Sequence, residues 1–333
     1  MPTHIPYPSI EQFRNVIRNV SQRAQYKGQD DNGDPVYDYL LPKPTLKYLG
    51  NTKLHGTNFA IGHNKDKKET WFQSREQIIT PEKDNAGAAR FFHDKDLSSL
   101  FDSIDANEIV IYGEWIGKSI QRNVAICQLE KRMVVFDALA DEKWLKPEEV
   151  KKIKNPDISI YNIYDFPTWE IEIDFSRPEE SQNKLVELTT KVADLCPVGV
   201  AFGVEGIGEG IVWRCQTEGY ENPKFIFKVK DERHQTSGIT KLKEVDTEAI
   251  RELRELATKI TPTWRLEQML EQACDLNNGG KIDRKFIGSY LKLVNQDILK
   301  EEKDVLGELD YSKVAGFVAQ IAKQYFLEAE SKL

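Results

Sequence analysis

The sequence predicts an α+β protein in which antiparallel sheets with flanking helices precede an all-helical C-terminal domain. Two observations support this prediction. Between residues 46 and 230, short runs rich in β-branched and aromatic residues alternate with turn signals. Beyond about residue 240, apolar residues recur at helical spacing and the strand signals end. We therefore expect one domain over residues 1–240 and a separate helical domain over residues 245–333.

The first part of the chain predicts a helix, a loop and three strands. Ser9-Ile10-Glu11-Gln12 has the form of a capping box, and Ile10, Phe13, Ile17 and Val20 follow at helical spacing. Residues 27–46 are rich in Gly, Asp, Asn and Pro, which favours a loop. Residues 46–63 then predict a strand, a turn and a second strand, and residues 70–74 a third.

The middle of the chain continues this mixture, and its end is helical. We expect residues 85–104 to be mostly helical, and a helix that starts near Pro178 to end at about Cys196, before Pro197. Further strands are expected at residues 108–115, 132–139, 158–164, 169–175, 199–204, 210–214 and 225–230. The expected C-terminal helices cover residues 246–260, 263–276, 285–299 and 312–329.

Composition places the chain among cytoplasmic globular proteins. Of its 333 residues, 40% are hydrophobic and 30% charged, and no apolar run approaches the ~20 residues of a membrane span. The N-terminus lacks the basic and apolar regions of a secretory signal, and four separated cysteines predict reduced thiols. We expect the cytoplasm, or the host cytoplasm for a viral chain. The net charge of −8 argues against indiscriminate adhesion to nucleic acid, although a local basic groove is compatible with it.

Residues 53–59, Lys-Leu-His-Gly-Thr-Asn-Phe, form the most informative segment of the chain. A lysine shortly before a glycine is the arrangement that a covalent nucleotidyltransferase needs. Lys53 would attack the α-phosphate of a nucleotide, and Gly56 would let the backbone approach it closely. Alone, Lys-x-x-Gly is a common pattern, and a strand lysine before a turn glycine explains it equally well.

Five further segments follow in order. They are Ser74-Arg75, Gly113-Glu114-Trp115-Ile116-Gly117, Val134-Val135-Phe136-Asp137, Glu209-Gly210-Ile211-Val212 and Phe227-Lys228-Val229-Lys230. Each has an ordinary alternative explanation: Arg75 as a solvated strand-end arginine, Phe136 as core, and the two lysines as a solvated strand face. Alternation along a strand does place Lys228 and Lys230 on one face. Glu205-Gly206-Ile207 has the same form as the segment at Glu209, so this position has two candidates.

Together these segments resemble the ATP-dependent RNA ligases of the RNA ligase 2 family, which includes the kinetoplastid RNA-editing ligases. That family has Lys-x-His-Gly-Ser/Thr-Asn-Phe at its nucleophile, and this chain matches from Lys53 to Phe59. DNA ligases and capping enzymes usually have aspartate where His55 stands. Two departures are Trp115, where the family commonly has phenylalanine, and Arg214, near which it often has lysine.

The resemblance implies a role for each matched residue. Lys53 is the nucleophile, Arg75 holds the α-phosphate or the terminal RNA phosphate, and Lys228 and Lys230 hold phosphates during transfer. Glu209 supports a divalent metal, with Glu114 contributing to the metal site in part through water. Nucleotide-binding positions are Lys53, His55, Gly56, Thr57, Asn58, Arg75, Glu114 at the ribose, Phe136 stacked on adenine, Glu209, Lys228 and Lys230. Glu209 is preferred to Glu205 because a β-rich run follows it directly.

The implied reaction joins a 3′-hydroxyl and a 5′-phosphate of RNA in three phosphoryl-transfer steps. ATP donates AMP to Lys53, the AMP moves to the RNA 5′-phosphate, and the 3′-hydroxyl then displaces it. Mg²⁺ or Mn²⁺ is the expected metal, because such ions neutralise the leaving pyrophosphate. We expect a monomer that acts on nicked duplex RNA in RNA repair, without a membrane partner, and whose helical domain engages RNA.

Three other functions remain as alternatives. An ATP-dependent DNA ligase and an mRNA capping enzyme share Lys-x-x-Gly and the paired lysines, but usually append a small β-barrel where this chain is helical. A catalytically silent RNA-binding protein is the third, and it would not need an intact set of Lys53, Glu209, Lys228 and Lys230.

Overall fold

The computed structural model describes residues 2–234, 242–278, 281–307 and 309–332. Contacts between Cα atoms divide the chain into two compact units. The first comprises Met1–Val20 and Thr45–Glu244, and the second Ser21–Pro44 and Val245–Leu333. Residues 21–44, which the sequence prediction assigned to the first domain, thus group with the helices. The predicted domain end at residue 240 lies outside the described residues.

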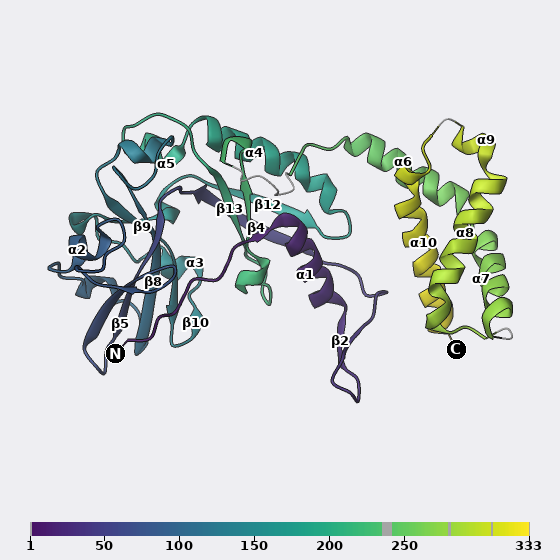
Figure 1. Ribbon diagram of the computed structural model, residues 1–333, viewed down its shortest axis with the longest axis horizontal. Helices are drawn as coiled ribbons and strands as arrows, with labels where there is room; N and C mark the ends of the chain where they lie inside the picture. Colours follow the sequence, from purple (N-terminus) through teal and green to yellow (C-terminus); the bar gives the residue numbers. More distant parts are fainter. Residues whose placement is uncertain (1, 235–241, 279–280, 308, 333) are drawn as a thin grey trace. The chain divides into compact units, whose positions relative to one another are not determined.

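The first unit contains two sheets (Figure 1). The five-stranded sheet has the order β1-β14-β13-β4-β12. One of its faces is covered by the first turns of α1 and by α4, whose apolar side chains pack on Tyr48, Trp213 and Phe227. The bounds are β1 Glu11–Gln12, α1 Phe13–Gln25, β4 Thr45–Lys53, β12 Thr168–Asp174, α4 Gln182–Asp194, β13 Gly210–Cys215 and β14 Phe227–Lys230.

The second sheet has seven strands, in the order β10-β9-β8-β5-β6-β7 with β11 beside β9. Phe59, Phe92 and Trp115 lie in the core between this sheet and the short helices that cover it. Its strands are β5 Thr57–Asn64, β6 Glu69–Ser74, β7 Ile78–Ile79, β8 Glu108–Ile116, β9 Arg132–Ala140, β10 Lys143–Trp144 and β11 Ile160–Asn162. The short helices of the unit are α2 Ala88–Phe92, η1 Ser98–Leu100, η2 Ala125–Gln128, α3 Pro147–Val150, η3 Pro156–Ile158, η4 Ile163–Asp165, η5 Pro178–Ser181, α5 Pro197–Ala201, η6 Pro223–Phe225 and η7 Glu232–His234.

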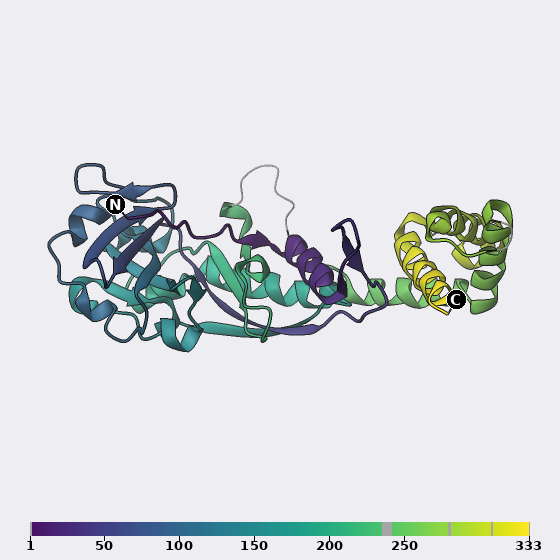
Figure 2. The ribbon, with the colours of Figure 1, turned by 90° about the horizontal axis from the view of Figure 1, so that it is seen from below.

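The N-terminal segment passes along the second sheet before it enters α1 (Figure 2). The Gln73 amide donates to the carbonyl oxygen of Ile5, and the Ile5 backbone N–H donates to the Gln73 side chain. The Tyr112 hydroxyl donates to the same Ile5 carbonyl over 2.8 Å. These bonds hold the N-terminal segment beside the place where β4 of one sheet leads into β5 of the other.

The antiparallel α+β prediction for this unit is confirmed, with parallel pairs only at β1–β14 and β11–β9 among the described strands. The capping-box prediction is wrong. Glu11 and Gln12 form β1, whose backbone pairs with Phe227 and Lys228, so α1 begins at Phe13. The Glu11 N–H donates to the Ile226 carbonyl oxygen over 3.1 Å, so pairing with β14 fixes this segment in an extended conformation.

Three other local predictions need correction. Residues 199–204 were expected to be a strand, but Pro197 starts the helix α5, with proline in the first turn where it lacks no needed donor. Residues 85–104 are helical only in α2 and η1. The expected loop at residues 27–46 contains the short hairpin of β2 Tyr26–Gln29 and β3 Pro35–Tyr37.

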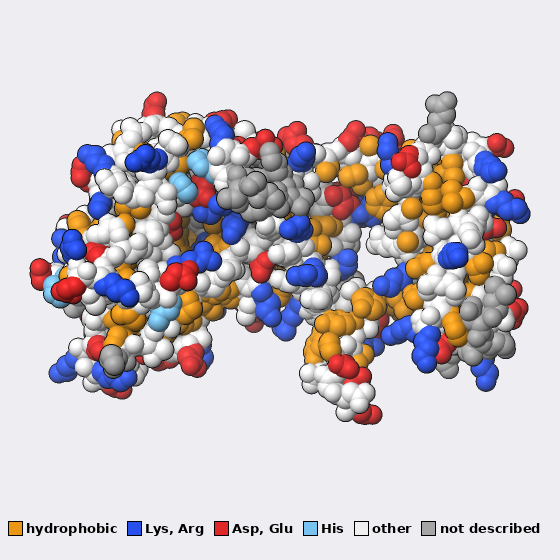
Figure 3. Space-filling model, in the orientation of Figure 1, with side chains coloured by type: hydrophobic (Ala, Val, Ile, Leu, Met, Phe, Trp, Pro, Cys, Tyr) orange, Lys and Arg blue, Asp and Glu red, His pale blue; other side chains and the backbone are white. Residues whose placement is uncertain are grey.

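The second unit is helical apart from this hairpin, which confirms the helical prediction for its C-terminal part. Tyr290, Val318 and Phe326 lie in its core. Tyr26 and Tyr39 of the hairpin region are about half exposed and contribute to an apolar surface (Figure 3). The helices are α6 Thr247–Ile260, α7 Thr263–Asn278, η8 Arg284–Phe286, α8 Ile287–Glu301, α9 Lys303–Leu306 and α10 Ser312–Glu330. Among the described residues, no helix combines the length and the apolar character that crossing a membrane requires.

Candidate active site

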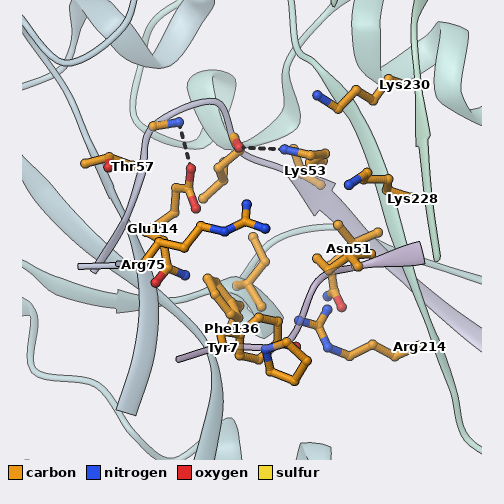
Figure 4. Close-up of a pocket in the computed structure, with 18 residues that line it drawn as sticks. Tyr7, Asn51, Lys53, Thr57, Arg75, Glu114, Phe136, Arg214, Lys228 and Lys230 are labelled. Carbon is orange, nitrogen blue, oxygen red and sulfur yellow. Dashed lines mark hydrogen bonds between the residues drawn. The ribbon is translucent and has the colours of Figure 1, made fainter. Parts of the chain in front are cut away.

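A cavity of about 360 Å³ lies in the first unit, where β4 leads into β5. Residues of both sheets and of the N-terminal segment line it (Figure 4). The lining residues include Tyr7, Asn51, Lys53, Gly56, Thr57, Asn58, Arg75, Glu114, Phe136, Val212, Arg214, Lys228 and Lys230. Basic groups predominate among the charged ones, so the cavity suits an anionic ligand.

The register of the five-stranded sheet brings the basic side chains together. Lys53 of β4 is opposite Gly210 of β13, which is opposite Lys230 of β14. The next row of the same face, two residues along, contains Asn51, Val212 and Lys228. Because side chains alternate between the faces of a strand, Phe227 and Val229 point into the apolar core while the lysines point away from it. The expected shared face of Lys228 and Lys230 is confirmed.

Glu209 joins the two lysines of the first row. Its Oε2 atom lies 2.7 Å from Lys53 Nζ, and its Oε1 atom lies 2.6 Å from Lys230 Nζ. His55 Nδ1 lies 3.5 Å from the same Oε2. Burial opposes ionisation of this carboxyl, but the hydrogen bond from His55 and the charges of the lysines outweigh burial and lower the pKa of Glu209 to about 2. Glu209 is therefore an anion held between cations.

Gly210 makes room for this arrangement. Its φ of +152° is a backbone conformation that other residues rarely adopt. A Cβ atom built there would lie 2.1 Å from the carbonyl oxygen of Val229. A side chain at this position would therefore force β13 and β14 apart beside Lys53 and Lys230.

Gly56 lies in the turn between the two sheets and forms a second close approach. Its backbone N–H donates to Glu114 Oε1 over 2.9 Å, and a Cβ atom there would lie 2.3 Å from the Trp115 carbonyl oxygen. Burial raises the pKa of Glu114 to about 7, against the opposing influence of Lys53 and of the Gly56 N–H. Glu114 thus changes charge near neutral pH, unlike Glu209.

Thr57 and Asn58 of the predicted heptad and Arg75 also lie at the cavity, whereas Phe59 lies in the core. The Thr57 hydroxyl accepts a hydrogen bond from the Asn85 amide over 3.0 Å. The Arg75 guanidinium extends into the cavity (Figure 4) and donates to the Ser9 hydroxyl over 3.1 Å. Its side chain is 61% exposed, so it remains accessible to a ligand.

Phe136 reaches the cavity because of a β-bulge. The register between β8 and β9 shifts between Tyr112, which pairs with Asp137, and Gly113, which pairs with Val135. Phe136 is the extra residue on the bulged strand, and a bulge changes the direction of a side chain. The Phe136 ring packs edge-on against Tyr7, with ring centroids 5.0 Å apart. Tyr7 thus helps to position the Phe136 ring. Arg214 lies over the same ring, with Cζ 5.7 Å from its centroid, and the ring borders the cavity (Figure 4).

A polar group of three side chains lies beyond Phe136: Tyr7, Asp137 and Arg214. No role was predicted for it from the sequence. Arg214 Nε lies 3.8 Å from Asp137 Oδ2, and the Tyr7 hydroxyl donates to the same oxygen over 2.8 Å. Burial raises the pKa of Asp137 although Arg214 opposes the change. The sequence did contain a signal, the alternation of side chains along a strand. Arg214 follows Val212 by two residues and so lies on the same face of β13, and Asn51 precedes Lys53 by two and so lies on the same face of β4. Tyr7 gave no such signal, because it lies in a segment without regular structure.

The structure therefore brings the predicted site residues together. Nine of them line the cavity: Lys53, Gly56, Thr57, Asn58, Arg75, Glu114, Phe136, Lys228 and Lys230. His55 and Glu209 lie next to it and are joined to Lys53 through Glu209. Glu205, the other candidate for the position of Glu209, is exposed. Burial and the neighbouring charges of Lys53, Lys230 and Arg75 lower the pKa of Lys228.

The acidic residues of the site fit a metal that is held mainly by a ligand's phosphates and by water. Among the described residues, no three His, Cys, Asp or Glu side chains are grouped as they would be in an all-protein metal site. Both Glu209 oxygens face lysine ammonium groups, so Glu209 would reach a metal through water. Mg²⁺ typically keeps several waters and needs only one or two carboxylates. Glu114 and Glu209 provide that number.

Comparison with known families decides which group of proteins has this site. Residues 47–230, more than half of the chain, match the RNA ligase family. The chain belongs to the RNA ligase family. The match begins in β4 and ends at Lys230, so it contains every residue that the sequence analysis placed in the site. Members of this family are nucleotidyltransferase-type enzymes.

Solved structures give a partial likeness to the same kind of protein. A variant of Naegleria gruberi RNA ligase with ATP and Mn has a TM-score of 0.44 and 18% identity, covering 70% of this chain and 58% of that one. The Naegleria gruberi RNA ligase with PPi has a TM-score of 0.43 and 19% identity, over the same shares of the two chains. The present chain thus spans 58% of the length of these two structures. Curated protein sequences gave no match.

Proposed function

We propose that this member of the RNA ligase family is an ATP-dependent RNA ligase that joins 3′-hydroxyl and 5′-phosphate ends through a lysyl-AMP intermediate. The observation that carries the proposal is the placement of Lys53, beside Glu209 and Lys230 and at the edge of an anion-binding cavity that Phe136 borders. The resemblance of the chain's sequence to the RNA ligase 2 family supports the same function.

In the first step, Lys53 Nζ attacks the α-phosphate of ATP, the phosphorus–nitrogen bond forms, and the bond to pyrophosphate breaks. Glu209 positions the Lys53 amine, since the 2.7 Å contact holds it at the edge of the cavity. A free amine is protonated near neutral pH, so one proton must leave before the attack. Lys228 and Lys230 line the same cavity and would bind the phosphates.

The base and ribose would lie toward Phe136 and Glu114. Phe136 offers a ring face for stacking, and Tyr7 limits its movement. Glu114, held by the Gly56 N–H, would accept hydrogen bonds from ribose hydroxyls. Asn58 and Thr57 border the same space. His55, through its contact with Glu209, would act as a positioning residue for Lys53.

In the later steps AMP passes to the RNA 5′-phosphate, and the 3′-hydroxyl then attacks that phosphate and releases AMP. Arg75 is exposed at the cavity and suits bidentate binding of a phosphate. A Mg²⁺ or Mn²⁺ ion near Glu209 and Glu114 would neutralise the leaving pyrophosphate. We propose that the helical C-terminal unit engages RNA, that nicked duplex RNA in repair is the substrate, and that the protein acts as a cytoplasmic monomer.

Covalent labelling tests this proposal. One portion of the purified protein is mixed with α-labelled ATP and Mg²⁺ and then denatured to measure bound label. A second, native portion is assayed for sealing of nicked duplex RNA, single-stranded RNA and nicked DNA. Label that survives denaturation together with sealing of RNA supports an RNA ligase. Label without any RNA sealing would favour a capping-type enzyme, and faster sealing of DNA would favour a DNA ligase. Label that is lost on denaturation would favour a silent RNA-binding protein.

A further inference from the structure

Ala86 has a strained backbone conformation. Its φ of +54° lies in the left-handed region, which a residue with a Cβ atom keeps only where its surroundings enforce it. Two donors do so here. The indole N–H of the buried Trp115 donates to the Ala86 carbonyl oxygen over 3.1 Å, and the Lys131 ammonium donates to the same oxygen over 2.7 Å. Phenylalanine, which the RNA ligase 2 family commonly has at the position of Trp115, has no N–H for the first bond.

The strained residue follows Asn85, whose backbone is fixed as well. The Asn85 N–H donates to Asp84 Oδ1 over 2.6 Å, and its carbonyl oxygen accepts from the Ala88 N–H over 3.2 Å. The Asn85 side-chain amide donates to the Thr57 hydroxyl over 3.0 Å. Thr57 lines the cavity on the side of Glu114 (Figure 4), and Asn85 is not among the described residues that line it. Asn85 thus acts on the cavity through Thr57.

The bond from Asn85 decides how the Thr57 hydroxyl can act. A hydroxyl has one hydrogen to donate and accepts through its lone pairs. The amide nitrogen of Asn85 only donates, so it occupies a lone pair of the Thr57 oxygen and leaves the hydroxyl hydrogen for another acceptor. The anionic ligand that suits the basic cavity has acceptor oxygens. The Thr57 hydrogen is therefore available to that ligand.

We propose that Asn85 is a positioning residue that makes Thr57 a hydrogen-bond donor to an oxygen of the bound nucleotide, and that the contacts of Ala86 hold Asn85 in place. The inference rests on the proposed function, since it takes ATP as the ligand. The contact joins residues 28 positions apart, and Asn85 belongs to none of the segments that carry the resemblance to the RNA ligase 2 family.

Covalent labelling of the full-length protein over a range of ATP concentrations tests the assignment. In Asn85→Ala the ATP concentration for half-maximal labelling should rise by roughly five- to tenfold, the effect of weakening one hydrogen bond. The rate at saturating ATP should stay within about twofold of the wild type. Thr57→Val should show a similar rise, and Asn85→Ala should add nothing in that background, because both changes act through one hydroxyl. Thr57→Ser, which keeps the hydroxyl, should need less ATP than Thr57→Val.

Trp115→Phe tests the support without a change at Asn85. It should also raise the ATP concentration for half-maximal labelling. Adding Ala86→Gly should reverse much of that rise, because glycine adopts the left-handed conformation without strain. Asn155→Ala is the matched control, since the Asn155 amide donates to the Ser99 hydroxyl over 3.0 Å, the same kind of bond away from the cavity. This control should label like the wild type.

The outcomes that overturn the assignment are distinct. Wild-type dependence on ATP in a folded Asn85→Ala overturns it, and so does an equal rise from Asn85→Ala with and without the Thr57 hydroxyl. Thermal unfolding shows whether each variant is folded. If Asn85→Ala does not fold, the pair at Trp115 and Ala86 decides, and no rise in Trp115→Phe overturns the assignment. Wild-type protein that takes no label from ATP overturns the proposed function and the assignment with it.

Discussion

Lys53 Nζ lies 2.7 Å from Glu209 Oε2, although 156 residues separate the two in the chain. The contact forms because the register of β4 with β13 places Lys53 opposite Gly210, directly after Glu209. Glu209 is 1% exposed and also contacts Lys230. Loss of its charge therefore affects two lysines of the site at once, and this leads to the first prediction.

Glu209→Gln should strongly reduce covalent labelling from ATP, because the amide does not hold both lysines as an anion does. It should also destabilise the fold at pH 7 by about 3 kcal/mol, the typical cost of losing one partner of a buried ion pair. Because the pKa of Glu209 is lowered to about 2, this stabilisation is complete above the unfolded pKa of about 4.3. It decreases as the pH falls toward 2.

Denaturant unfolding of the wild type and Glu209→Gln at pH 7 and pH 3 measures this difference, which should be smaller at pH 3. Glu205→Gln is the matched control, since Glu205 is exposed four residues earlier. Labelling and stability of Glu205→Gln should equal those of the wild type. An equal loss of labelling in both variants would mean that the contact with Lys53 does not explain the role of Glu209.

Lys53→Ala should take no label from ATP and should not seal RNA with an ordinary 5′-phosphate. It should still seal pre-adenylated RNA to some extent, because the last step does not use the covalent link. Lys47→Ala of the same strand is the control, since the Lys47 side chain is 75% exposed and pairs with Glu172. Label that remains on Lys53→Ala after denaturation would assign the nucleophile elsewhere.

Lys228→Ala and Lys230→Ala should each slow labelling by on the order of a hundredfold or more, as removal of a group that stabilises transferring charge does. Lys224→Ala, an exposed lysine shortly before β14, should change the rate by less than about twofold, the usual scale of surface substitutions. The rates are measured from the label bound per unit time at saturating ATP. Near-normal rates in both strand variants would make these lysines an ordinary solvated face.

Glu114 predicts a pH dependence of labelling. Its pKa is raised to about 7 by burial, so it is largely neutral below that pH and ionised above it. If its carboxylate accepts from the ribose hydroxyls, labelling at low ATP should increase as the pH rises through about 7. Glu114→Gln should be slower than the wild type above pH 7 and should lack this increase. A rise of unchanged size in Glu114→Gln would assign the titration to another group.

The sequence predicts the parts of the site that depend on local pattern. Lys53 before a turn between two strands, and Lys228 and Lys230 on one strand face, follow from alternation and turn residues. The preference for Glu209 over Glu205 has a local reason too, the β-rich run that follows Glu209. Other features depend on tertiary pairing. The contact of Glu209 with Lys53 follows from the register of β13 with β4, and the direction of Phe136 follows from a bulge between β8 and β9. The pattern along one strand predicts neither.

The same reason explains the errors in the fold. Glu11 and Gln12 satisfy a capping-box pattern, but pairing with β14 decides their conformation. Residues 199–204 have strand-like composition, yet Pro197 starts a helix whose Gly199 fits against Ala125. In both places a contact with a distant segment overrides the local preference.

The last prediction concerns the helical unit, which we propose engages RNA. Every residue that lines the cavity lies between Tyr7 and Lys230, so a fragment of residues 1–244 should take label from ATP and should join pre-adenylated RNA. It should transfer AMP to an RNA 5′-phosphate poorly, because the strand is no longer held in position. Circular dichroism must first show a folded fragment, since residues 21–44 group with the helices that it lacks. The three steps are then assayed separately against the full chain. An equal loss in all three would indicate that the helices only stabilise the fold, and full activity in all three would refute a role in RNA engagement.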